Sequence, residues 1–161
     1  MNSVFNIHGG IHPEEEKHLS NPGTVLDAGL PPSLVLPLSQ HIGKPSSLLV
    51  EPGDQVLGGQ LLADADGMVS VPLHAPTSGT VVAIEPRPVP HPSALNNLCL
   101  ELACDGEDRW VASAGCEDWR AETPESLIAR IRAAGIAGMG GAGFPTAVKL
   151  MARDRLPLHT L

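Results

Sequence analysis

The clearest structural pattern in the sequence is VEPGDQVLGGQLLADADGMVSVPLHAPTSGTVVAIE, residues 50–85. Short runs of Val, Leu, Ile and Ala alternate in it with Gly, Pro, Asp and Ser, a pattern typical of short strands joined by tight turns. The sharpest turns fall at Gly53-Asp54 and Ser78-Gly79. The apolar faces of two short interlocked sheets would come from Val56, Leu57, Leu61, Val81, Val82 and Ile84. We therefore predict a small β-structure built from two consecutive halves.

The same stretch resembles the barrel-sandwich hybrid of biotinyl and lipoyl domains. In those domains a V-x-x-G-D-x-V-x-x-G-Q-x-L half is followed by an A-P-x-S-G-x-V half, and both are present here. Carrier domains of this kind attach their cofactor to a lysine on an exposed hairpin between the halves. Here that place holds ADADGMVSVP, residues 63–72, and the lysines of the chain are Lys17, Lys44 and Lys149. We expect no covalent biotin or lipoate, and a structural or docking role for the module instead.

Short apolar segments on either side of this stretch define the predicted boundaries of the module. The runs that read as strands are SLVLPLSQ, SSLLV, QVLGGQLLADA, GMVSVPLHAP, GTVVAIE and LCLELAC. They place a mainly β module at residues 34–103, after an irregular segment at 1–33 and before a polar linker at 104–122. The run EPRPVPHPSALNN, residues 85–97, is too rich in proline for a helix or a central strand, so we expect an extended loop there.

The clearest helix is TPESLIARIRAA, residues 123–134. Thr123 suits the N-cap, Pro124 the first helical position and Glu125 the positive end of the helix dipole. Its apolar face would consist of Leu127, Ile128, Ile131 and Ala134. Gly135 then stops the helix and leads into the glycine run GIAGMGGAGFPTAVKL, residues 135–150.

The glycine run matches two common nucleotide motifs poorly. Gly138, Gly140 and Gly143 satisfy G-x-G-x-x-G, but a helix precedes them where a dinucleotide-binding fold has a strand. No G-x-x-x-x-G-K-[ST] pattern occurs in the chain. The sequence therefore does not support a Rossmann unit or a Walker loop.

Composition excludes several classes of partner. The 161-residue chain has a formal charge of −8 and 2% aromatic residues, so we expect no nucleic acid partner. Cys99, Cys104 and Cys116 lack the spacing of a zinc or iron–sulfur site, and we expect free thiols. No apolar run is long enough to span a membrane, so any membrane role would be peripheral.

Two histidines near the start of the chain are four residues apart, His8 and His12. Gly9, Gly10 and Pro13 disfavour a helix that would present both rings to a metal ion. We predict an ordered surface segment there and no metal site.

Two further resemblances concern the whole chain. The pattern GxGGAGFPTxxK resembles the flavin loop of the NADH-oxidising, FMN-carrying subunit of respiratory complex I. Four segments of the chain, in this order, resemble the RnfC (RsxC) component of Rnf (Rsx) ion-translocating electron transport complexes. The last is the glycine run that contains this pattern, and the first three are FNIHGGIHPEEEKHLS, LVLPLSQHIGKPSSLLVEPGDQVLGGQLLA and SVPLHAPTSGTVVAIEPRPVPHPS. The chain is identified on these four segments as similar to that family.

The resemblance implies a fold and a function. It implies a barrel-sandwich hybrid module followed, at residues 123–161, by the start of an α/β domain like the complex I flavin subunit. It also implies an electron-transfer subunit at the cytoplasmic face of the bacterial inner membrane, peripheral to it, whose partners are NADH and the other subunits of an Rnf-type complex. The implied cofactors are FMN and NADH in the flavin domain, and two [4Fe-4S] clusters in a C-terminal region not included in these 161 residues.

The flavin-loop motif also implies site residues. Gly138, Gly140, Gly141, Ala142 and Gly143 would form a backbone wall against FMN. The resemblance places Phe144 near the ring system, Thr146 at the exit of the loop, and the Lys149 ammonium toward the flavin phosphate. Complex I has an arginine where this chain has Met139, which removes one cationic contact.

The end of the chain bears on what it can do alone. ARDRLPLHTL ends without the acidic segment and the cluster cysteines that the family pattern places further on, so we expect an N-terminal fragment. Only one wall of a flavin site would then be present, and we expect these residues alone to bind FMN weakly and to be inactive. We also expect no fixed structure beyond about residue 145. The alternative interpretation is a non-catalytic barrel-sandwich docking module within an assembly.

Overall fold

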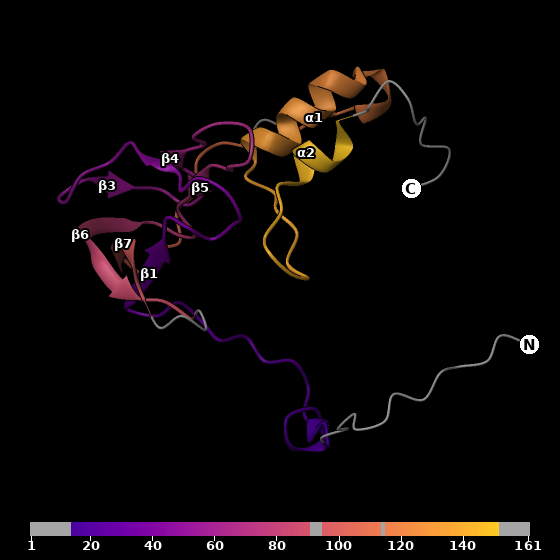
Figure 1. Ribbon diagram of the computed structural model, residues 1–161. Coiled ribbons are helices and arrows are strands. Elements are labelled where there is room, and N and C mark those ends of the chain that lie inside the picture. The colour runs from indigo at the N-terminus through magenta and orange to yellow at the C-terminus, as the bar shows by residue number, and fades with distance from the viewer. Residues whose placement is uncertain (1–13, 91–94, 114, 152–161) are drawn as a thin grey trace, which may run out of the picture.

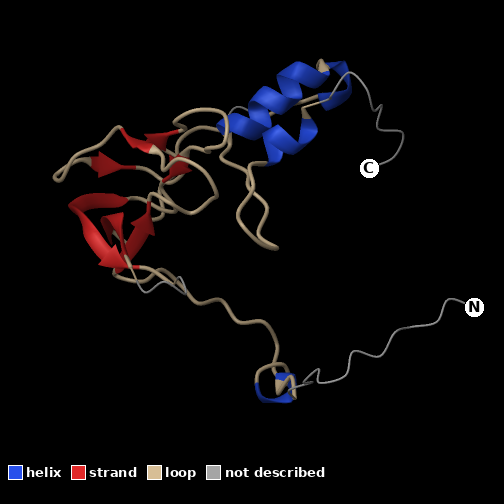
Figure 2. Cartoon of the chain, in the orientation of Figure 1, coloured by secondary structure: helices blue, strands red, loops and turns tan. Residues whose placement is uncertain are grey.

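The computed structural model describes residues 14–90, 95–113 and 115–151. Its strands gather at one end of the molecule and its two α-helices at the other (Figure 1, Figure 2). The elements are η1 (Lys17–Leu19), β1 (Ser33–Pro37), β2 (Ser47–Leu48), β3 (Gln55–Val56), β4 (Leu61–Asp64), β5 (Leu73–His74), β6 (Gly79–Pro88), β7 (Asn96–Cys104), η2 (Trp119–Ala121), α1 (Pro124–Ala133) and α2 (Thr146–Leu150).

Two small antiparallel sheets form the β-module. One has the order β1-β7-β6-β3 and the other the order β2-β4-β5. The side chains between them form the core, which consists of Val56, Leu62, Ala75, Val81, Leu100 and Leu102. Because each sheet buries one face against the other, short strands suffice to close a core. The predicted mainly β module is confirmed.

The predicted loop at residues 85–97 is wrong at both ends. β6 continues through Pro86 to Pro88, and β7 begins at Asn96, so the two strands pair over nine partner positions. β3 pairs with β6 only at Gly79 and Thr80, which leaves the rest of β6 as a sheet edge on that side. Proline is tolerated there because an edge does not require every backbone N–H. The histidine at position 91 lies outside the described residues.

The polar run after β7 is attached to the module. The Ser78 hydroxyl donates to the Asp105 carboxylate over 2.7 Å, and the backbone N–H of Arg109 donates to the Ser78 hydroxyl over 2.9 Å. Gly58 exchanges backbone hydrogen bonds with Arg109 and Val111, at 2.8 and 2.9 Å. The first part of the segment predicted as a linker therefore extends the β-module.

Asp105 makes this attachment sensitive to acid. The Arg109 guanidinium, with the Glu107 backbone N–H and the Ser78 hydroxyl, lowers the pKa of the Asp105 carboxyl from 3.8 to about 2. A carboxyl whose pKa is lower in the folded state stabilises the fold fully above its unfolded pKa, and this contribution is lost as the pH falls through the folded pKa. The contribution of Asp105 is therefore lost between about pH 4 and pH 2.

We expect Asp105→Asn to lower the thermal midpoint at pH 7 and to flatten its decline between pH 4 and pH 2. Thermal unfolding followed by circular dichroism across this range measures both effects. Asp27→Asn is the matched control, since Asp27 lies in an exposed segment and its one hydrogen bond within the described residues is from the Gly29 N–H. An unchanged acid slope in Asp105→Asn would contradict the assignment.

The described part of the N-terminal segment forms an exposed arm. Residues 14–33 are all exposed, and the arm leads away from the β-module (Figure 1). It contains a single 3-10 turn, Lys17–Leu19. His8 and His12, for which we predicted an ordered surface segment and no metal site, lie outside the described residues.

The helical part of the chain begins as the sequence predicts but continues further than predicted. Thr123 accepts the Ser126 N–H over 3.2 Å, so α1 has the predicted cap. The chain then turns at Gly135, whose φ of +69° favours glycine. The expectation of no fixed structure beyond about residue 145 is wrong for residues 146–151, because α2 forms at Thr146–Leu150 and buries Ala147. Residues 152–161, to which it also applied, lie outside the described residues. Packing against α1 provides the partner that the sequence did not indicate.

Candidate functional site

The glycine run forms a hairpin, which we call the glycine hairpin and define as residues 137–145. Ala137 and Pro145 form an antiparallel bridge at its base. The Gly138 N–H donates to the Phe144 carbonyl over 2.9 Å, and the Thr146 N–H donates to the Ile136 carbonyl over 3.0 Å. In Figure 1 the hairpin is the orange loop that hangs from the two helices toward the middle of the molecule. It therefore has a closed base and an open tip.

The backbone at the tip of the glycine hairpin has unused donors. The N–H groups of residues 139–143 donate no hydrogen bond to any part of the chain that the structure describes. A Cβ on Gly140 or Gly141 would meet nothing within 4 Å. Consecutive free N–H groups in a turn form concave sites for anions. The N–H groups of the tip are therefore available to a ligand without first breaking a hydrogen bond to the described chain.

Lys149 returns from α2 to the base of the glycine hairpin. Its Nζ lies 2.7 Å from the place where a Cβ on Gly138 would be, and 5.8 Å from the centre of the Phe144 ring. Among the described residues Lys149 forms no ion pair, whereas Lys17 and Lys44 are paired with Glu15 and Asp66. The missing side chain of Gly138 makes the space that the ammonium occupies, over the Phe144 ring and without a described carboxylate beside it.

The glycine hairpin rests on the β-module. The Ile42 N–H donates to the Ala142 carbonyl over 2.9 Å. A Cβ on Gly143 would lie 2.8 Å from the Gln40 carbonyl oxygen and 2.9 Å from the His41 Cα. Gly143 has a φ of +63° and allows this close approach between two backbones.

The end of α1 also contacts the β-module. A guanidinium nitrogen of Arg132 donates to the Met68 carbonyl over 3.0 Å, and the other donates to the Gly67 carbonyl. These carbonyls lie in the segment 63–72, where the resemblance to carrier domains expects a modified lysine. A Cβ on Gly135 would lie 2.5 Å from the Pro72 carbonyl oxygen. In this chain the segment is thus a contact surface for α1.

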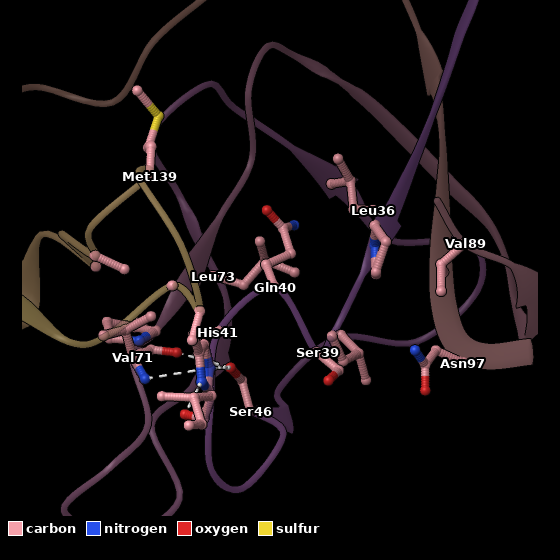
Figure 3. A pocket seen from close by; sticks show the side chains of 18 of the residues that line it. Leu36, Ser39, Gln40, His41, Ser46, Val71, Leu73, Val89, Asn97 and Met139 are labelled. Atoms are coloured by element: carbon pink, nitrogen blue, oxygen red, sulfur yellow. Dashed lines mark hydrogen bonds between the residues drawn. The ribbon is translucent and has the colours of Figure 1, made fainter. Parts of the chain in front are cut away.

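A groove of about 1350 Å³ lies between the β-module and the glycine hairpin. Its lining comes from β1 and the segment after it, from residues 71–74, from the facing ends of β6 and β7, and from residues 134–143. None of these described lining residues is Asp, Glu, Lys or Arg, although 17% of the chain is charged. Figure 3 shows the labelled side chains of Gln40, Ser39 and Asn97 along it. The groove suits an uncharged polar group or ring better than an ion.

His41 and Ser46 form a buried polar cluster in this groove, and the sequence did not single them out. The Val71 N–H donates to His41 Nε2 over 3.3 Å, and the Ser46 hydroxyl donates to the Val71 carbonyl over 2.7 Å. His41 Nδ1 lies 3.1 Å from the Ile42 carbonyl oxygen (Figure 3). Nearby, burial lowers the pKa of His74, which also lines the groove. A single histidine in a turn, as in SQHIGKPSS, carries no periodic signal that could have identified the cluster.

The eight residues predicted for the flavin site occupy one continuous piece of structure. Six of them lie in the glycine hairpin: Gly138, Gly140, Gly141, Ala142, Gly143 and Phe144. The other two, Thr146 and Lys149, lie in the helix α2 that follows it. Met139, which stands in place of the arginine of complex I, is 99% exposed at the tip and points away from His41 (Figure 3).

Cys99, Cys104 and Cys116 are all free thiols, as predicted. Within the described ranges, no three side chains of His, Cys, Asp or Glu lie close enough together to hold a metal ion. No helix in these ranges is long and apolar enough to cross a membrane.

The chain is similar to one named family and to proteins with one name. Residues 5–107 match the family model described as the RnfC barrel sandwich hybrid domain. Proteins named as the C component of an ion-translocating oxidoreductase complex are 52% identical in Vibrio cholerae and 50% identical in Salmonella newport, each over 147 residues and 91% of this chain. The match covers 19% and 20% of those proteins, so the chain spans about a fifth of the length of the curated relatives. Since the family model covers most of the chain, including every strand, the predicted fold and family are confirmed, and the chain belongs to the RnfC barrel sandwich hybrid family.

Proposed function

We propose that this chain is the N-terminal part of an electron-transfer subunit in a membrane-associated, ion-translocating oxidoreductase complex. In this proposal the β-module and the glycine hairpin form one wall of a site for FMN and NADH. The remaining walls and two [4Fe-4S] clusters would belong to the part of the subunit beyond these residues, and the site would face the cytoplasm. The names of the relatives support the class of complex.

One observation carries the proposal: the ammonium of Lys149, which has no ion pair with any described residue, lies against Gly138 at the base of a hairpin whose five tip N–H groups have no acceptor in the described chain. The chain has an excess of carboxylates, 18 against 10 lysines and arginines, so an unpaired lysine beside free donors favours an anionic ligand. A phosphate monoester, such as that of FMN, supplies the charge and the acceptor oxygens that this arrangement lacks.

The residues present also fit the ring of a flavin. Gly140 and Gly141 have open space where side chains would be, so a flat ring can approach their backbone. The adjoining groove is free of charged side chains. Bound FMN would accept a hydride from NADH and release electrons singly to clusters. The chain's own residues would bind the phosphate, orient the ring and exclude water from one face.

FMN titration followed by quenching of flavin fluorescence tests the proposal. We expect weak or no binding to the 161 residues alone, because one wall does not enclose a ligand. We expect the complete subunit to bind FMN and Lys149→Gln to weaken its binding roughly 10- to 100-fold, the effect of losing one charge-assisted phosphate contact. Lys17→Gln, which removes a lysine from the exposed arm, is the control.

Each contrary result has a separate meaning. Equal affinity of wild type and Lys149→Gln would remove Lys149 from the phosphate site. Stoichiometric micromolar binding by the 161 residues alone would show that the site is complete within them. No FMN binding by the complete subunit would overturn the flavin function.

A non-catalytic docking role is the second candidate, and the exposed arm favours it. Leu19, Val25, Leu26 and Leu30 of the arm are all exposed. Apolar side chains at such density on an extended segment favour a contact with another protein. Removal of residues 1–31 would then abolish assembly with the other subunits while leaving any FMN binding by the complete subunit unchanged.

A further inference from the structure

Few interactions within the glycine hairpin hold its backbone in one conformation. Within it there is a single backbone hydrogen bond among the described residues, from Gly138 to Phe144, and this bond is one of the two that form the bridge at its base. The N–H groups of its tip have no acceptor in the described chain, and three of its tip residues are glycines, which lose the most conformational freedom on ordering. An ordered tip therefore requires support from outside the hairpin.

That support comes from one short piece of the β-module, residues 40–42. The Ile42 N–H holds the Ala142 carbonyl, and the backbones of Gln40 and His41 lie against Gly143. Since these residues follow β1 in a turn outside both sheets, sheet hydrogen bonds do not hold them in place. The backbone on both sides of the piece is attached to the β-module, since the Leu38 N–H donates to the Leu98 carbonyl and the Lys44 N–H to the Val69 carbonyl. Within the piece itself, the side chain of His41 adds a further attachment.

The side chain of His41 connects this piece to the segment around Val71, elsewhere in the β-module. His41 is 8% exposed, and its Nε2 accepts the Val71 N–H over 3.3 Å. The Ser46 hydroxyl, 3.4 Å from Nε2, donates to the Val71 carbonyl instead of to the ring. Nε2 is therefore the unprotonated nitrogen, and Nδ1 carries the proton that it donates to the Ile42 carbonyl.

We infer that His41, as the neutral Nδ1–H tautomer, is a positioning residue that holds the glycine hairpin on the β-module and so keeps its N–H donors in one arrangement. The other neutral tautomer would set a ring N–H against the Val71 N–H, leaving that backbone donor without its acceptor and the ring N–H with only the Ser46 oxygen 3.4 Å away. The inference about the contact stands on the geometry alone. Its consequence for flavin binding rests on the proposed function.

Amide hydrogen exchange in the 161-residue chain, followed by NMR, tests the contact. We expect His41→Ala to speed the exchange of the Val71 and Ile42 amides roughly tenfold each, because both hydrogen bonds lose their support. Gly138, which donates within the hairpin, should change less. His41→Gln, whose amide oxygen can replace Nε2 as acceptor, should restore most of the protection at Val71. His18→Ala, in the exposed arm, is the matched control.

A second variant tests the contact from the other side. Gly143→Ala puts a Cβ against the Gln40 carbonyl and should release Ile42 while Val71 remains protected by His41. Exchange at Leu102 in the core of either variant reports global unfolding. An Ile42 amide that stays protected in Gly143→Ala, or ring-nitrogen spectra that show a proton on Nε2 of His41, would overturn the inference.

Flavin binding separates this inference from the proposed function. In the complete subunit we expect His41→Ala to weaken FMN binding and His41→Gln to restore it partly. If exchange behaves as described and the wild-type subunit binds no FMN, the proposed function fails and the contact stands. If FMN binds and His41→Ala leaves its affinity unchanged, the positioning role fails.

Discussion

Leu100→Ala is expected to lower the free energy of unfolding by about 2–5 kcal/mol, the range for deletion of a fully buried leucine. Leu100 is 0% exposed and sits in β7, opposite Leu36 of β1 and Ile84 of β6. Its side chain belongs to the core cluster between the two sheets. Alanine leaves a cavity there that neighbouring strands cannot close without losing their register.

Urea unfolding of the wild type and the variant, followed by circular dichroism, measures this effect. Leu98→Ala is the matched control, because Leu98 lies two residues earlier in the same strand and is 42% exposed. We expect the control to lose about 1 kcal/mol or less. Similar losses in both variants would mean that the core does not lie between these sheets as described.

Gly43→Ala is expected to destabilise the β-module by about 3 kcal/mol or more, through two separate causes. Gly43 has a φ of +98°, where an alanine is strained by about 1–3 kcal/mol. A Cβ would also lie 2.1 Å from the Val69 carbonyl oxygen, which accepts the Lys44 N–H. Overpacking of this kind adds about 1–3 kcal/mol, because backbone must move.

Gly53→Ala separates these two causes. Gly53 has a φ of +105°, close to that of Gly43, but a Cβ there would meet nothing within 4 Å. The variant should therefore show the cost of the backbone conformation alone. The difference between the two variants in urea unfolding gives the cost of the contact with Val69, and equal losses would refute that contact.

One part of the candidate site can be seen in the sequence and another part cannot, and binding of FMN at either part stays a prediction. The glycine hairpin was found because its residues are consecutive and its pattern resembles a known loop. The polar cluster of His41, Ser46 and Val71 joins residues up to 30 positions apart through single hydrogen bonds. No spacing rule predicts such bonds, since they depend on where two turns meet in space.

The strands of the β-module, the cap of α1 and the composition of the glycine hairpin could all be predicted from the amino-acid sequence. These follow from local physics: alternation of apolar residues, turn residues at fixed offsets, and a hydroxyl that caps a helix. The tertiary structure alone decided that β6 and β7 extend through prolines at a sheet edge, that α2 packs on α1, and that the hairpin rests on residues 40–42. Each of these features depends on which surfaces come into contact after the chain has folded. The residues within one segment do not specify which distant segment they will contact.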